Sequence, residues 1–141
     1  MAIVQAVCDS FLTELLTATH DFTASTGHTF KIALYNSDAS LGNSTTSYSA
    51  TNEISGAGYS AGGATLTNIT PVFSNGKAYI DFSDITWSSA SFTARGALIY
   101  NSSAGGNAVA VMNFGSDRTK DGEDFVVSFP STTDPIFAII K

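Results

Sequence analysis

The second half of the chain alternates short apolar runs with turn residues, and this alternation constrains the fold more than any other feature. The clearest turn is Asn75-Gly76, the strongest short signal for a β-hairpin, because both residues tolerate positive φ angles. Strand-like runs that recur at roughly 8–12 residues with turns between them are typical of a sandwich or barrel. We therefore predict a mainly β fold: a single antiparallel β-sandwich, jelly-roll-like, with one N-terminal α-helix. The runs expected to form or continue strands are Ala64–Phe73, Lys77–Asp84, Ile85–Ser88, Arg95–Tyr100, Ala108–Phe114, Phe125–Phe129 and Ile136–Ile140, with loops at 101–107 and Pro130–Pro135.

Residues 3–18 are predicted to form the helix. Apolar residues recur there at three- and four-residue spacings and would make one wide apolar stripe. The segment has two acidic and no basic residues, so few i,i+4 ion pairs can support it and packing must hold it. It could cover one face or end of the sheet, or lie at a subunit contact. The stripe consists of Val4, Val7, Phe11, Leu12, Leu15 and Leu16.

A strand and a long loop follow. Residues 29–35 alternate, with Phe30, Ile32 and Leu34 on one face. Residues 36–63, rich in Gly and Ser, are too long for an ordinary connection. Because aromatic residues occur within this loop, we expect a packed excursion with at most a short helix near 51–55. The chain of 141 residues is predicted to be one domain, 1–141, with the sandwich over about 29–141.

The charge balance limits the partners. Twelve acidic and six basic residues give a net charge of −6, and only 13% of residues are charged. Six dispersed cations do not make an electrostatic footprint for nucleic acid, so nucleic-acid binding is excluded as a main function. Low charge also suits a protein that buries much of its surface in an assembly.

The N-terminal sequence indicates a cytoplasmic origin. The first residues lack the cationic region of a signal peptide, and no apolar run approaches the roughly 18 residues that span a bilayer. We expect synthesis in a cytoplasm and no membrane partner. Cys8 has no partner for an intramolecular disulfide and is expected to be a buried small apolar residue.

One pattern imitates a catalytic motif. Residues 58–62 match G-x-S-x-G, the nucleophile elbow, with Ser60 as the serine. That chemistry needs a strand–turn–helix around the serine and, in the hydrolase fold, a histidine after it. Here glycine surrounds the serine, and both His20 and His28 precede it. The sequence therefore predicts no catalytic residues and a protein that is not an enzyme.

Metal and cofactor sites are not predicted either. Residues 117–124 imitate the first half of a calcium loop, but the twelfth position is Ser128 and two cations oppose a metal, so a solvated acidic turn is expected. His20 and His28 lack the neighbours of a zinc site and are expected at the surface or an interface. Asp81 and Asp84 are expected to face solvent or a turn.

An aromatic sugar-binding platform is the remaining candidate site. Trp87 and Phe92, with the tyrosines, could stack on a glycan because amphipathic rings suit polar ligands. A single Trp in a β domain, however, is more often part of the core.

Two motifs carry a resemblance to a known group of proteins. Residues 48–63 read Y-x-A-T-x-E-x-x-G-x-G-Y-x-A-G-G, and residues 95–100 read R-G-A-x-I-Y. From about Phe30 to its end, the chain resembles small virion proteins of tailed bacteriophages, which join these two motifs. The resemblance implies a non-enzymatic structural protein that is located in the virion and made in the host cytoplasm.

Within that group, composition favours a capsid cement or decoration protein that stabilises the shell. A small, acidic, single-domain protein is suited to add to a formed shell from solution. Low charge and the apolar C-terminal run favour self-association, with a homotrimer expected, and the major capsid protein is the expected partner. The alternatives are a tail, neck or fibre-adaptor component, or a carbohydrate-binding module for host adhesion.

Overall fold

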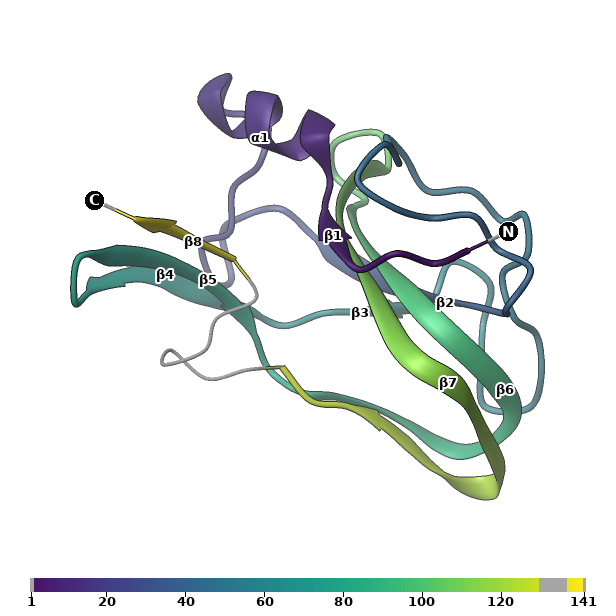
Figure 1. Cartoon of the computed structure of the whole chain (residues 1–141). Coiled ribbons are helices and arrows are strands. Elements are labelled where there is room, and N and C mark those ends of the chain that lie inside the picture. Colours follow the sequence, from purple (N-terminus) through teal and green to yellow (C-terminus); the bar gives the residue numbers. More distant parts are fainter. Residues whose placement is uncertain (1, 130–136, 141) are drawn as a thin grey trace.

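The computed structural model describes residues 2–129 and 137–140, and these form two antiparallel sheets and one short helix (Figure 1). The larger sheet has the strand order β1-β7-β6-β2-β3 and the smaller has the order β4-β5-β8. The predicted mainly β, sandwich-like fold with one N-terminal helix is confirmed, although neither sheet closes into a barrel. The elements are β1 (Ala6–Val7), α1 (Asp9–Leu16), β2 (Phe30–Tyr35), β3 (Ala64–Thr65), β4 (Asn68–Ser74), β5 (Lys77–Phe82), β6 (Ile85–Asn101), β7 (Asn107–Val127) and β8 (Phe137–Ile140).

The helix is shorter than the sequence predicts, because the residues before Cys8 are extended. Val7 pairs with Ala110 of β7, and Val4 donates a backbone hydrogen bond to Leu41 at 2.8 Å. β-Branched residues are stiff at χ1 and favour extended backbone, and β7 offers an edge with which they can pair. The prediction of a helix from residue 3 is therefore wrong for its first half.

The longest feature is the hairpin of β6 and β7, which the sequence divides into several runs. The two strands follow one another around a corner (Figure 1). At this corner Ala94 pairs with Arg118 and Gly96 pairs with Asn113, so residues 114–117 oppose Arg95 alone. Extra residues on one strand bend it and increase its twist. The expected strands at 85–88 and 95–100 are thus one strand, and those at 108–114 and 125–129 belong largely to another.

The short turns confirm the sequence signals. Asn75 and Gly76 have φ angles of 51° and 78°, and they join β4 to β5 as a two-residue hairpin. The expected loop at 101–107 joins β6 to β7. The expected Pro130–Pro135 interruption lies outside the described residues, as does Ile136, but Phe137–Ile140 forms the strand expected at the C-terminal end, where it pairs with β5.

One cluster of buried apolar residues extends from Ile3 to Phe129. Phe82 of the smaller sheet contacts Phe30 of the larger sheet, with ring centroids 5.7 Å apart, and Phe129 lies 5.8 Å from Phe82. Cys8 is fully buried, as predicted, and it lies at the N-terminal cap of α1. The two sheets and the helix therefore share a core.

Candidate functional site

A half-buried carboxylate, that of Glu53, organises the Gly/Ser-rich loop. Its Oε2 accepts a hydrogen bond from the Tyr48 hydroxyl at 2.6 Å, and its Oε1 accepts one from Tyr59 at 2.6 Å. The Gly62 N–H also donates to Oε1, at 2.7 Å. The Tyr59 oxygen in turn accepts from the Leu34 N–H of β2 at 2.9 Å. Glu53 thus fastens a segment without regular secondary structure to the larger sheet.

The two sequence motifs meet at this carboxylate. The Tyr100 hydroxyl, from the second motif, donates to the Gly62 carbonyl at 2.6 Å, and the Tyr100 ring stacks on Tyr48 with centroids 4.7 Å apart. Gly63 has a φ angle of +79°, and a Cβ there would lie 1.9 Å from the Ile32 carbonyl oxygen. Only glycine fits so close to β2. The tyrosines, the acid and the glycine pair Gly62-Gly63 of the motifs are therefore structural parts of one cluster.

The tyrosines of this cluster remain protonated donors over a wide pH range. Burial and the hydrogen bond to Glu53 raise the pKa of Tyr48 to about 12. Burial first and the Glu53 charge second raise the pKa values of Tyr35 and Tyr100. Burial, followed by the hydrogen bond to Glu53, raises the pKa of Tyr59. The cluster is built to hold neutral hydroxyls beside a carboxylate.

The G-x-S-x-G pattern does not form a nucleophile elbow. Ser60 is exposed, and its carbonyl accepts a hydrogen bond from the Gly63 N–H at 3.0 Å in a turn that leads to β3. A nucleophile elbow requires a helix directly after the serine, but here the next described element is the strand β3. His20 and His28 instead lie within hydrogen-bonding distance of Asn101.

The acidic stretch 117–124 is largely exposed to solvent, as predicted, but it is not a turn. It is part of β7 and pairs with β6, with Thr119 opposite Thr93 and Asp121 opposite Ser91. Arg95 lies 3.5 Å from Asp117. Pairing along the whole hairpin outweighs the local turn propensity of Asp and Gly. Within residues 2–129 and 137–140, no group of three His, Cys, Asp or Glu could hold a metal ion.

The aromatic residues expected for a glycan platform are in the core. Trp87 and Phe92 are each 6% exposed, and the Trp87 ring meets Phe125 edge-on at 5.9 Å. The expectation that the single Trp is a core residue is confirmed. The prediction that Asp81 faces solvent is wrong, because Asp81 is buried. Burial raises its pKa, and its Oδ1 accepts a hydrogen bond from the Phe82 N–H at 2.8 Å. Asp84 is exposed, as predicted.

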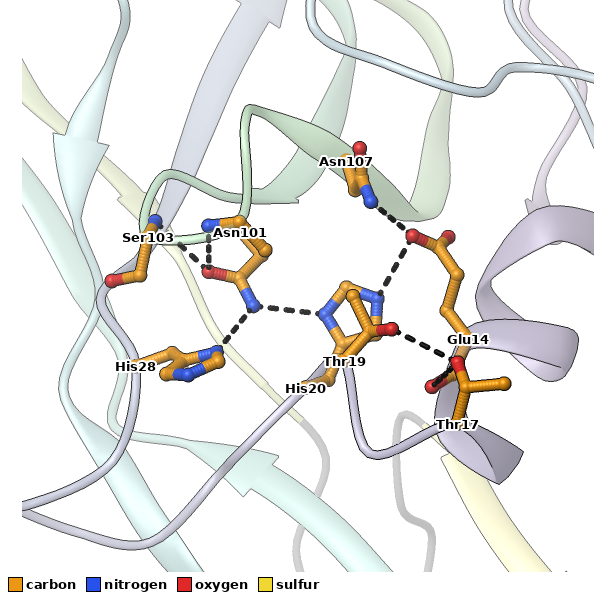
Figure 2. A network of polar contacts seen from close by, with 9 residues as sticks. Glu14, Thr17, Thr19, His20, His28, Asn101, Ser103 and Asn107 are labelled. Carbon is orange, nitrogen blue, oxygen red and sulfur yellow. Dashed lines mark hydrogen bonds and ion pairs between the residues drawn. The ribbon is translucent and has the colours of Figure 1, made fainter.

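A second polar cluster lies at the opposite side of β6 and contains both histidines (Figure 2). The Asn101 side chain is fully buried, and its Nδ2 lies 2.9 Å from the Nδ1 atoms of both His20 and His28. His20 Nε2 lies 3.7 Å from Glu14 Oε2, and the same carboxylate oxygen accepts a hydrogen bond from Asn107. The prediction of surface histidines is wrong for His20, whose side chain is fully buried.

The His20 environment favours the neutral imidazole. Burial lowers its pKa, and the nearby Glu14 carboxylate opposes this only in part. The rings of Phe11 and Phe30 lie 4.9 Å and 6.1 Å from the imidazole, measured between centroids. Sequence reasoning missed this cluster because its members are far apart in the chain; the one local signal is a polar residue, Asn101, ending a buried apolar strand.

The outer surface carries several exposed apolar side chains. Leu16 of α1 is 89% exposed and Phe73 of β4 is 65% exposed. A groove of about 470 Å³ lies between the end of α1 and the β4–β5 hairpin, and another of about 450 Å³ lies along β7. The first is lined in part by Leu15, Phe22, Pro71, Ala78 and Ile80, and the second in part by Phe114, Arg118, Lys120, Phe125 and Val127.

Comparison with known protein families, with curated proteins and with solved structures finds no match for this chain. Among the described residues, no helix has the length and apolar character needed to cross a membrane.

Proposed function

We propose that the protein is a non-enzymatic structural component of a tailed-bacteriophage virion, and that it acts as a cement or decoration protein on the outside of the capsid. The observation that supports this proposal is the Glu53 cluster. Every motif residue that takes part in it, from Tyr48 to Tyr100, contributes to holding one loop on a β scaffold. A motif of this kind maintains a surface shape, which supports a structural role.

The expected mode of action is multivalent binding to the assembled shell. A homotrimer of this chain would contact several major capsid protein subunits at once, so that modest individual contacts add. It would oppose separation of the subunits because a ligand specific for the assembled state stabilises that state. A closed trimer would also cover strand edges.

Two surfaces are candidates for the shell contact: the loop 36–63 and α1. The loop presents small residues that permit close approach of a partner backbone. The helix presents Leu12 and Leu16, which are 44% and 89% exposed, one turn apart. Deletion of residues 41–46 is a poor test of the loop, because Leu41 exchanges backbone hydrogen bonds with Ala2 and Val4. That deletion would therefore also disturb the N-terminal segment.

A point substitution separates the loss of a shell contact from a loss of folding more cleanly. Leu16→Lys places a cation in the last turn of α1, where it favours the helix dipole, so the fold should persist. If α1 contacts the shell, the variant should bind purified capsids more weakly than the wild type in a sedimentation assay. Ser83→Lys, which adds the same charge at an exposed position between β5 and β6, should bind normally.

The position on the virion decides among the proposed roles. Electron cryomicroscopy of intact particles should show this chain on the outer shell near local three-fold positions, and particles that lack it should lose heat stability. A copy number comparable to that of the shell protein supports the cement role. If the chain is found only at the tail vertex and particles without it are equally stable, the cement role is wrong and an adaptor role replaces it.

A further inference from the structure

The Asn101 side chain joins the end of β6 to the connection that precedes β2, which is also held by hydrogen bonds from Ser102 to the Thr29 carbonyl and from Asn68 to the His28 carbonyl. His20 and His28 both lie in the connection from α1 to β2, residues 17–29, and Asn101 ends β6 (Figure 2). α1 is tied to the same region because Glu14 accepts a hydrogen bond from Asn107 at the start of β7. We call Asn101, His20 and His28 the Asn–His junction.

The hydrogen bonds of its oxygen atom fix the orientation of the Asn101 side-chain amide. Its Oδ1 accepts hydrogen bonds from the backbone N–H groups of Ser103 at 3.0 Å and Ala104 at 3.2 Å. A flipped amide would direct its NH₂ group at these two donors. The NH₂ group must therefore point to the histidines, and both of its hydrogens are donated, one to each Nδ1.

This geometry requires both histidines to accept at Nδ1. Each imidazole is then neutral and carries its hydrogen at Nε2, the atom that in His20 faces Glu14. Protonation of either ring would place a second N–H at Nδ1, directed at the N–H of the amide. The hydrogen bond would become a contact between two donors, and Asn101 could not turn to relieve it.

The charged groups around His20 do not remove this conflict. On the α1 side, Glu14 lies 3.7 Å from Nε2 and would favour a protonated ring. On the other side, His28 disfavours a second positive charge. Neither group offers an acceptor at Nδ1, where the conflict arises, and the aromatic rings of Phe11, Phe22 and Phe30 also pack around the imidazole. Asp21, which lines the same groove as His20, interacts electrostatically with His28.

We propose that the Asn–His junction is an acid-sensitive contact: proton uptake by His20 breaks it and makes local release of α1 and the 17–29 connection more favourable, while the sheets stay folded. Because the folded environment lowers the pKa of His20, the junction holds at a pH above the ordinary value of about 6.5 and is lost as the pH falls further. The inference concerns the fold alone and does not depend on the proposed virion role.

Cys8 supplies a probe that is already in the chain. Its side chain is fully buried at the start of α1, and burial, with Asp9 and Glu14 nearby, raises its pKa to about 11. Release of α1 should expose the thiol. A pyridyl disulfide, which reacts with thiols in acid, would then label it by thiol–disulfide exchange, in which the Cys8 sulfur forms the new S–S bond and thiopyridone leaves.

The expected result is a labelling rate, corrected for the reactivity of a free-thiol peptide, that rises about tenfold per pH unit below about pH 6.5 if opening takes up one proton. The dichroism of the sheets and the fluorescence of Trp87 should not change over this range. The rise should level off near the pH at which the His20 ring of the folded protein titrates, followed by NMR. Protection of Cys8 that persists while His20 titrates would overturn the proposal.

Substitution of the central residue gives the sharper test. In Asn101→Asp a carboxylate oxygen accepts hydrogen bonds from protonated rings, so the corrected labelling should fall, not rise, as the pH is lowered from 8 to 5. Asn75→Asp adds the same charge in the exposed β4–β5 turn and should retain the wild-type profile. An Asn101→Asp protein with the wild-type profile would also refute the junction mechanism, and the NMR comparison remains decisive if that variant does not fold.

Discussion

Single side chains with several partners hold the irregular parts of this molecule. Glu53 accepts three hydrogen bonds from groups spread over the Gly/Ser-rich loop, and Asn101 makes four contacts with two segments, the 17–29 connection and the turn after β6. Tyr100 and Asn101 are consecutive on β6, so their side chains point to opposite faces. One strand end therefore fastens the loop 36–63 on one face and the connection 17–29 on the other.

Removal of the Glu53 carboxylate should destabilise the protein markedly. Hydrogen bonds to a charged group contribute about 1.5–3 kcal/mol each, and Glu53→Ala leaves the hydroxyls of Tyr48 and Tyr59 without this acceptor. We expect the free energy of unfolding, measured by denaturant titration, to fall by about 3 kcal/mol or more. Glu123→Ala removes an exposed partner of Lys120 and should change it by less than about 0.5 kcal/mol; equal effects would contradict the assigned role.

The close approach of Gly63 to β2 can be tested with a matched glycine. Gly63 and Gly76 have φ angles of +79° and +78°, but a Cβ at Gly76 meets nothing within 4 Å. Gly76→Ala should cost only the left-handed backbone strain, about 1–2 kcal/mol. Gly63→Ala should cost about 1–3 kcal/mol more because its methyl group overlaps the Ile32 carbonyl. Thermal unfolding of both variants measures the difference.

At the scale of elements, the sequence predicts what depends on local pattern. The Asn75-Gly76 hairpin, the strand 30–35 and the C-terminal strand follow from turn chemistry and alternation. Prediction from the sequence fails where a partner that is distant in the chain determines the local structure. Ile3 to Val7 have helical spacing yet pair with Leu41 and β7, and the acidic stretch 117–124 remains in a strand because β6 pairs with it. The Asn–His junction leaves one local signal, Asn101 at the end of a buried apolar strand, and its pairing is not predictable because His28 and His20 lie 73 and 81 residues away from Asn101.

The helix α1 should depend on one buried ring. Its N-cap residue, Cys8, makes no side-chain capping bond, and Phe11 is the one buried residue among Asp9–Leu16. Phe11→Ala should therefore cost about 3–5 kcal/mol. Leu12→Ala, at the next and partly exposed position, should cost less than about 1 kcal/mol. Similar losses for the two variants in denaturant titrations would show that the outer face of α1 is covered.

At the scale of the whole molecule, the buried tyrosines make the free energy of unfolding decrease at alkaline pH. The pKa values of Tyr35, Tyr48, Tyr59 and Tyr100 are all raised in the folded protein. Their ordinary pKa is about 10, so between about pH 10 and the higher folded values the unfolded chain loses protons that the folded chain keeps. The unfolded state then binds fewer protons, and stability falls as the pH rises. This stabilisation is complete below about pH 10.

We therefore expect the denaturation midpoint to be constant from about pH 8 to 9.5 and to fall steeply between about pH 10 and 12. For a fully buried tyrosine such as Tyr35, the slope approaches about 1.4 kcal/mol per pH unit. Phenolate absorbance should appear together with unfolding and not before it. Tyr48→Phe removes one suppressed ionisation and should reduce the slope, although it also removes a hydrogen bond to Glu53.

The net charge of −6 offers a rival cause for the loss of stability at alkaline pH, since self-repulsion grows as further protons are lost. Added salt screens that repulsion but does not change the proton balance, so the fall should persist in 1 M salt. A midpoint that becomes independent of pH in high salt would assign the effect to net charge and not to the tyrosines.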